Sequence, residues 1–132
     1  MICLDSCFLI DVLRHKPKAI EKWENIDKNL TAITIINLYE LMSGIYAVKD
    51  RNYEKHLGIL KELVAHIPVF QLDSFSVKQA SKISGELSLK GQIIDELDVL
   101  IAGICLSNGC NVIITNNVNH FSRIKGLKVE GY

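Results

Sequence analysis

Three acidic residues that are far apart in the sequence have the types and positions needed for metal chemistry. Asp5 directly follows the apolar run Ile2–Leu4, Glu40 lies within about two helical turns of the end of a second such run, and Asp98 begins a later helical pattern. Carboxylates held close together repel one another and raise their own pKa values unless a cation neutralises them. Mg²⁺ and Mn²⁺ suit such oxygen ligands. The three acids therefore indicate a divalent-metal site in which they are both metal ligands and catalytic groups.

A ligand set of this kind favours hydrolysis of phosphodiester bonds. A bound metal lowers the pKa of a water molecule, orients it for attack on phosphorus and stabilises charge on the leaving oxygen, so no side-chain nucleophile is required. The chain correspondingly has no Ser-His-Asp order of a hydrolase triad, no Gly-x-Ser-x-Gly motif and no glycine-rich phosphate loop. The sequence thus predicts a metal-dependent hydrolase.

Polar residues near the three acids are candidates for accessory roles at the same site. They are Ser6, Asp95, Thr115, Asn116 and Asn117. The acids themselves also have ordinary structural explanations. Asp5 can cap the helix that follows it, and Asp98 can complement the dipole of its helix, as Asp95 can. Glu40 alone can be a solvated helix residue. The catalytic interpretation therefore depends on a fold that brings these positions together.

Apolar patterns between these residues predict alternating strands and helices. Short runs rich in β-branched residues predict strands at Ile2–Leu4, Thr31–Ile35, Val69–Leu72, Val112–Thr115 and Leu127–Glu130. Apolar residues at helical spacing predict helices over 38–46, 57–67, 77–87 and 97–105, the last with a glycine cap near Asn108-Gly109. This alternation indicates an α/β fold of three layers, with a mainly parallel central sheet covered on both faces. In such sheets ligands bind beyond the carboxyl ends of the strands.

The composition predicts a single domain over residues 1–132, because 48% hydrophobic content is enough for one sizeable core. Charged residues form 23% of the chain and cancel to zero net charge, so any contact with nucleic acid must be local. The four cysteines lack zinc-ligand spacing and are expected as buried apolar residues in a reducing, cytoplasmic compartment. No targeting segment is recognised at the start. No uncharged apolar stretch approaches the roughly 18 residues of a membrane span, so a soluble protein is expected.

Several motifs, in order along the whole chain, resemble those of PIN-domain proteins and, more narrowly, of VapC-type toxins from type II toxin–antitoxin pairs. They are Leu4-Asp5-Ser6 with Phe8-Leu9-Ile10-Asp11, Thr34 with Asn37-Leu38-Tyr39-Glu40-Leu41 and Gly44, Asp98-Val99-Leu100-Ile101-Ala102, Thr115-Asn116-Asn117 with His120-Phe121, and Gly126-Leu127-Lys128-Val129-Glu130. Each motif is short, but the ordered set at these intervals is specific. The resemblance implies a PIN-like fold and an endoribonuclease in which Asp5, Glu40 and Asp98 bind Mg²⁺ or Mn²⁺.

The same resemblance implies partners: an RNA substrate, a small VapB-like antitoxin that covers the site, and a second copy of the chain in a homodimer. The chain also departs from the family pattern. Many members carry a fourth acid after the last strand, where this chain has Asn116, Asn117 and Asn119, so we expect a second metal to bind weakly. Cys7 stands where a small polar residue is frequent. His120 is interpreted as a surface histidine and is left out of the catalytic set.

Two other functions stay open at this point. An aspartate-nucleophile phosphatase also places an aspartate after its first strand, but Cys7 replaces the companion aspartate expected two positions later. A catalytically weak PIN-like module would bind RNA or protein without cleavage, and its signature would be loss of one of the three acids. Because all three are present, the sequence favours the endoribonuclease.

Overall fold

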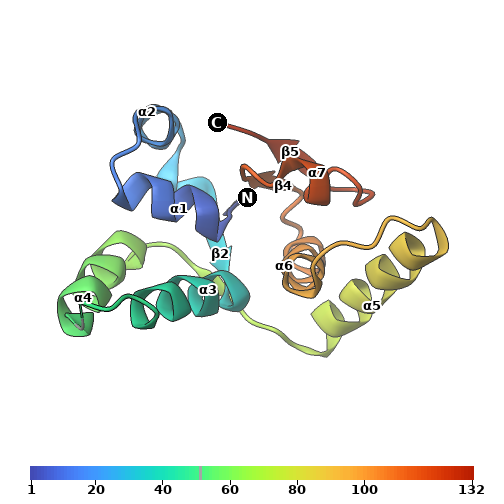
Figure 1. Cartoon of the computed structure of the whole chain (residues 1–132). Helices are drawn as coiled ribbons and strands as arrows, with labels where there is room; N and C mark the ends of the chain where they lie inside the picture. Colours follow the sequence, from blue (N-terminus) through green and yellow to red (C-terminus); the bar gives the residue numbers. More distant parts are fainter. Residues whose placement is uncertain (51) are drawn as a thin grey trace.

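The computed structural model describes residues 1–50 and 52–132, which form a central sheet and the helices around it (Figure 1). The strands are β1 (Ile2–Leu4), β2 (Thr31–Thr34), β3 (Val69–Phe70), β4 (Val112–Ile114) and β5 (Lys128–Glu130). Their order across the five-stranded sheet is β3-β2-β1-β4-β5, and each neighbouring pair is parallel. The predicted parallel sheet is confirmed.

Helices connect the strands and cover both faces of the sheet. They are α1 (Ser6–Leu13), α2 (Pro17–Asn25), α3 (Ile35–Tyr46), α4 (Tyr53–Val64), α5 (Ser74–Leu89), α6 (Glu96–Ser107) and α7 (Val118–Phe121), with a 3-10 turn at Lys28–Leu30. In Figure 1, α1 to α4 lie on one side of the strands and α5 and α6 on the other. The predicted three-layer α/β/α arrangement is therefore confirmed.

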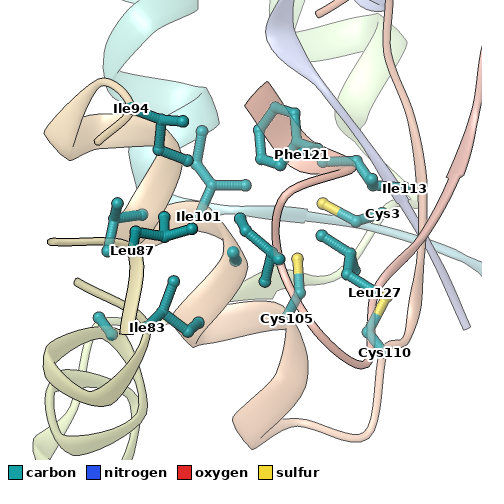
Figure 2. Close-up of a cluster of buried hydrophobic side chains, with 14 residues drawn as sticks. Cys3, Ile83, Leu87, Ile94, Ile101, Cys105, Cys110, Ile113, Phe121 and Leu127 are labelled. Atoms are coloured by element: carbon teal, nitrogen blue, oxygen red, sulfur yellow. The ribbon is translucent and has the colours of Figure 1, made fainter. Parts of the chain in front are cut away.

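Adjacent residues on the strands belong to two separate hydrophobic cores, because successive side chains of a strand point to opposite faces. Cys3 and Ile113 pack with α5 and α6 in the core drawn in Figure 2. Leu4 and Ile114 pack with α1, α3 and α4 in the other core. All four side chains are fully buried. Burial on both faces explains why these strands are continuous apolar runs in the sequence.

Several predicted boundaries were wrong, and local chemistry explains the clearest case. The strand predicted over Thr31–Ile35 ends at Thr34, because the Thr34 hydroxyl accepts from the Asn37 N–H at 3.1 Å and the Asn37 Oδ1 accepts from the Thr34 N–H at 2.9 Å. This reciprocal capping box begins a helix, so Ile35 belongs to α3. Likewise β3 ends at Phe70, and the helix predicted over 57–67 is Tyr53–Val64, ending before Pro68. The strand predicted to end at Thr115 ends one residue earlier, at Ile114. The strand predicted to begin at Leu127 begins one residue later, at Lys128.

Three helices had no predicted range, α1, α2 and α7, although α1 was anticipated as the helix that Asp5 can cap and the glycine cap of α6 was predicted correctly. α2 has nine residues and begins with Pro17, which is pre-organised for a first helical position. α7 has four residues, too few to show a repeating apolar pattern. After α6, Gly109 has a φ of 71°, as a glycine cap requires.

Over residues 1–50 and 52–132, no helix combines the length and apolar character needed to cross a membrane.

Candidate active site

The strand order reverses beside β1, because β2 and β3 lie on one side of it and β4 and β5 lie on the other. In open parallel sheets, ligands bind at the carboxyl ends of the strands next to such a reversal. Asp5 directly follows β1 and Thr115 directly follows β4, and the Thr115 hydroxyl donates to Asp5 Oδ2 at 2.6 Å. The candidate site therefore lies at this edge of the sheet.

Asp5 is only 5% exposed, and its carboxylate is held by donors on both of its oxygens. The Ser6 backbone N–H donates to Oδ1 at 2.9 Å, and the Asn37 amide donates to the same oxygen at 3.1 Å. The Cys7 thiol donates to Oδ2 at 3.2 Å. Because the Ser6 contact is the N-cap of α1, the capping explanation for Asp5 is confirmed. A capping role and a place in the site coexist.

Glu40 reaches the same edge because α3 begins directly at the end of β2. Its side chain is half-buried, and its Oε1 accepts from the Ser6 hydroxyl at 2.9 Å. That hydroxyl also lies 3.5 Å from Asp5 Oδ1, so a single residue links the two acids. Burial raises the pKa of Glu40, and the charges of Asp5 and Asp98 raise it further, although the Ser6 hydrogen bond lowers it.

Asp98 lies in the first turn of α6 and is 8% exposed. The Asn117 amide nitrogen and the His120 Nδ1 each lie 2.7 Å from its Oδ2. Burial raises the pKa of Asp98, the His120 contact lowers it, and the charge of Asp5 raises it. Asp5, Glu40 and Asp98 are therefore close enough to influence one another electrostatically.

The accessory candidates divide into two groups. Ser6, Thr115 and Asn117 donate to the carboxylates through the contacts described above. Asp95 is exposed and caps α6, accepting from the Leu97 N–H at 2.9 Å. Asn116 is exposed as well, and its backbone N–H lies 3.4 Å from the Cys7 sulfur. The last two therefore border the cluster of acids and do not contact its carboxylates.

Sequence reasoning assigned no role to Asn37 and gave Cys7 an incorrect one. Asn37 is fully buried against Asp5, and the Thr34-x-x-Asn37 capping pattern was the signal that could have located it. Cys7 is only half-buried, whereas the other three cysteines are buried as predicted, and all four are free thiols. Burial and the charge of Asp5 raise the pKa of Cys7, which keeps the thiol protonated as a donor. Cys7 is thus a polar member of the site.

His120 was interpreted as a surface histidine, and the structure corrects that interpretation. Its side chain is 37% exposed, but its Nδ1 contacts Asp98. Asn117 and His120 are three residues apart at the start of α7, a spacing that places side chains on one helix face. That spacing was the available signal, although a helix of four residues hides it.

The donor chemistry of the site fits a hard divalent cation. Burial raises the pKa values of Glu40 and Asp98, and the charges of the neighbouring acids raise them further; a cation would favour the charged form of both carboxylates. Among residues 1–50 and 52–132, no group of three or more His, Cys, Asp and Glu side chains is placed so that it could hold a metal ion by itself. Mg²⁺ needs no such cage, because it keeps several waters and takes one or two carboxylates together with substrate phosphates. The residues fit an open site.

Comparison with known proteins agrees with this fold. The model of the PIN domain matches residues 2–127, and the chain belongs to the PIN domain family. Within that family its curated relatives include VapC ribonucleases. It is 30% identical over 129 residues to the tRNA(fMet)-specific endonuclease VapC of Shigella flexneri, an alignment covering 98% of this chain and 96% of the relative. It is 32% identical over 136 residues to Ribonuclease VapC1 of Methanocaldococcus jannaschii, covering 97% and 85%.

Solved structures give the same result in three dimensions. One similar structure is VapBC2 from Rickettsia felis, bound to a DNA fragment from the promoter of its own genes. The superposition gives a TM-score of 0.86 and 26% identity, and it covers 100% of this chain and 99% of the other. DNA-bound VapBC from Salmonella typhimurium gives a TM-score of 0.86 and 28% identity, covering 98% and 96%. The predicted PIN-like fold is confirmed.

Proposed function

We propose that this chain is an endoribonuclease that depends on Mg²⁺ or Mn²⁺ bound by Asp5, Glu40 and Asp98, within one nuclease domain over residues 1–132. One observation carries the proposal: where the strand order of the parallel sheet reverses, the Ser6 hydroxyl links Asp5 to Glu40, and the charge of Asp98 acts on Glu40. The relationship to VapC ribonucleases supports RNA as the substrate. The metal would supply a water of lowered pKa and positive charge near the leaving oxygen.

The chain's own residues hold the carboxylates in place for this chemistry. Asp5 accepts hydrogen bonds on both oxygens, which restricts rotation of its carboxylate. The Ser6 hydroxyl holds Glu40 beside Asp5, and α6 brings Asp98 to the same edge. The Cys7 thiol donates to Asp5 and stays protonated, so it does not act as a nucleophile. The protein thereby pre-organises the ligands, which reduces the rearrangement that binding requires.

The decisive experiment is cleavage of a panel of structured and single-stranded RNAs, with Mg²⁺, with Mn²⁺ or with excess chelator. We expect the wild-type protein to cut only in the presence of metal, and Asp5→Asn or Asp98→Asn to lower the rate by on the order of 100-fold. Asp50→Asn, at an exposed acid in a pair with His56, serves as the matched control. Equal cleavage by all four proteins would remove the carboxylates from the reaction. RNA binding without cleavage by the wild type would instead favour the catalytically weak module.

The proposal includes a role as the toxin of a type II pair, restrained by a VapB-like antitoxin. An apolar groove of about 450 Å³ lies between α1, α3 and α4, and Ile10, Leu41 and Ile59 are among its lining residues. Leu41 directly follows Glu40 in α3, so the groove begins beside one of the three acids and runs toward the C-terminal ends of α1 and α3. The two solved relatives described above are VapBC complexes, which supports a protein partner of this kind.

An inhibition assay tests the partner. We expect a small protein encoded beside this gene to inhibit cleavage, and expression of the chain alone to stop growth of a host unless Asp98→Asn is present. Ile59→Lys, at a groove residue that is 42% exposed, should keep the cleavage activity and lose the inhibition. Val77→Lys, at a residue of α5 that is 47% exposed, should remain inhibited. Equal inhibition of both variants would contradict the groove as the binding site.

A homodimer is the remaining part of the proposal. Large apolar side chains on α5 support it, because Phe75 is 76% exposed and Leu89 is 92% exposed, and exposed apolar surface commonly marks protein interfaces. Light scattering on the purified protein should give the mass of two chains. A monomer mass at high protein concentration would contradict this part and leave the proposed nuclease activity unaffected.

A further inference from the structure

Two side chains that follow β4 meet one oxygen of Asp98. Asn117 precedes α7 and His120 lies within it, and the Asn117 Nδ2 and the His120 Nδ1 are each 2.7 Å from Asp98 Oδ2. The two nitrogens are 3.0 Å from each other. Over residues 1–50 and 52–132, no side chain hydrogen-bonds to the second oxygen, Oδ1. The two oxygens of this carboxylate therefore have different surroundings.

The hydrogens that each group can carry decide which of these atoms donate and which accept. An ionised carboxylate oxygen can only accept, so the His120 Nδ1 carries the hydrogen and donates to Oδ2. The Asn117 Nδ2 is also a donor, which means that its contact with Nδ1 is not a third hydrogen bond. Two donors thus converge on one acceptor. Rotation of the Asp98 carboxylate would break both bonds at once.

We propose that His120 is a positioning residue of the candidate site: by donating to Oδ2, it fixes the Asp98 carboxylate and leaves Oδ1 available to the divalent cation. The inference rests on the proposed function. Residues that hydrogen-bond to metal ligands orient those ligands, and their loss commonly weakens metal binding by about tenfold or more. His120 therefore supports the site without touching the reacting atoms.

Direct measurement of Mn²⁺ binding by electron paramagnetic resonance tests this role without relying on activity. We expect His120→Ala to raise the Mn²⁺ dissociation constant by about tenfold. His120→Asn places an amide nitrogen near the position of Nδ1 and should restore most of the affinity. His120→Gln places it near Nε2 and should resemble His120→Ala. His56→Ala is the matched control, since the His56 Nε2 lies 2.9 Å from Asp50 on the exposed surface.

The variants separate failure of this inference from failure of the proposed function. If Asp5→Asn and Asp98→Asn bind Mn²⁺ as tightly as the wild type does, the proposed metal site is wrong. The role of His120 is then wrong as well. If those two substitutions abolish binding and His120→Ala does not alter it, only the role of His120 is wrong. Rescue by glutamine as strong as rescue by asparagine would also overturn it. The comparison of asparagine with glutamine stays decisive if the alanine variant folds poorly.

Discussion

At the residue scale, Asn37 connects the end of β2 to the acid that follows β1. Its Oδ1 accepts from the backbone N–H and the hydroxyl of Thr34, at 2.9 and 2.7 Å, and its Nδ2 donates to Asp5 at 3.1 Å. The amide needs both its acceptor and its donor ends for these contacts. One buried side chain therefore sets the start of α3 and the orientation of Asp5.

Replacing Asn37 with aspartate tests this connection with almost no change of shape. Asn37→Asp removes the donor and places two carboxylates in contact, so we expect the unfolding free energy at neutral pH to fall by about 3 kcal/mol. Urea denaturation measures the loss. Asn25→Asp on the exposed surface of α2 is the control, with an expected change within about 0.5 kcal/mol. Similar losses in both variants would show that the buried amide has no special role.

The acids of the site and three of their donors, Ser6, Thr115 and Asn117, could be named from the sequence, but Asn37 and His120 could not, and no pairing of a donor with an acid could be predicted. An acidic residue directly after a buried apolar run is conspicuous, which singled out Asp5. Asn37, Thr115 and His120 contact the acids across 32, 110 and 22 positions of the chain. A polar residue that donates to a buried acid resembles a solvated one in sequence, since the difference lies in which strands become neighbours.

At the element scale, the contact between α5 and α6 is close because Gly103 has no side chain. A Cβ at Gly103 would lie 2.6 Å from the Ala80 Cβ and 2.7 Å from the Ala80 backbone nitrogen. The backbone of α5 cannot move aside as a flexible side chain could. Since α6 carries Asp98, this packing also determines where that acid lies.

Two glycine substitutions on the same pair of helices should have opposite effects. Gly103→Ala forces the helices apart and should lower the unfolding free energy by about 2 kcal/mol. Gly85→Ala on α5 meets nothing within 4 Å and should raise it by about 0.5 kcal/mol, because alanine is the better helix former. Denaturant unfolding of both variants measures the two changes. A neutral Gly103→Ala would show that the helices can separate without cost.

Elements with a continuous apolar run or a clear apolar period were predictable, whereas their ends depend on capping. The strands at Ile2–Leu4 and Val112–Ile114 and the helix Glu96–Ser107 were located from apolar runs and spacing. The boundary between β2 and α3 depends on the Thr34–Asn37 box, which overrides the β-branched character of Ile35. Short elements such as α7 lack enough residues to produce a period.

At the scale of the whole molecule, the strand order brings three distant parts of the chain to one edge. β1 lies between β2 and β4, so the residues that follow these strands become neighbours. Alternating strands and helices predicted a parallel sheet, but the order could not be predicted, because apolar runs do not specify their partners. The reversal beside β1 follows from the long connection through α5 and α6, which returns the chain to the opposite edge of β1.

Asp11 links the first helix to the residues after β5. The Lys16 ammonium lies 2.8 Å from its Oδ1, and the Tyr132 hydroxyl donates to its Oδ2 at 2.9 Å. The Tyr132 ring also packs edge-on against Phe8, with ring centroids 4.8 Å apart. The hydrogen bond from Lys16, assisted by Tyr132 and opposed by burial, holds the pKa of Asp11 below its ordinary value of 3.8. The carboxylate is therefore more acidic in the folded protein than in the unfolded chain.

The lowered pKa of Asp11 predicts a pH-dependent contribution to stability. The unfolded chain binds a proton at this residue more readily, so the contribution is fully present above about pH 4 and is lost as the pH falls through the lowered pKa. Asp11→Asn should reduce the unfolding free energy by about 1 kcal/mol at neutral pH, and the gap to wild type should narrow below about pH 4. Tyr132→Phe keeps the ring and removes one hydrogen-bond donor to Asp11. Its loss of unfolding free energy should therefore be smaller than that of Asp11→Asn, and it should also shrink as the pH falls. Denaturant unfolding from neutral pH to below about pH 4 measures the difference in unfolding free energy between the wild type and each variant. If that difference stays constant as the pH falls, the Asp11 carboxylate is not its cause.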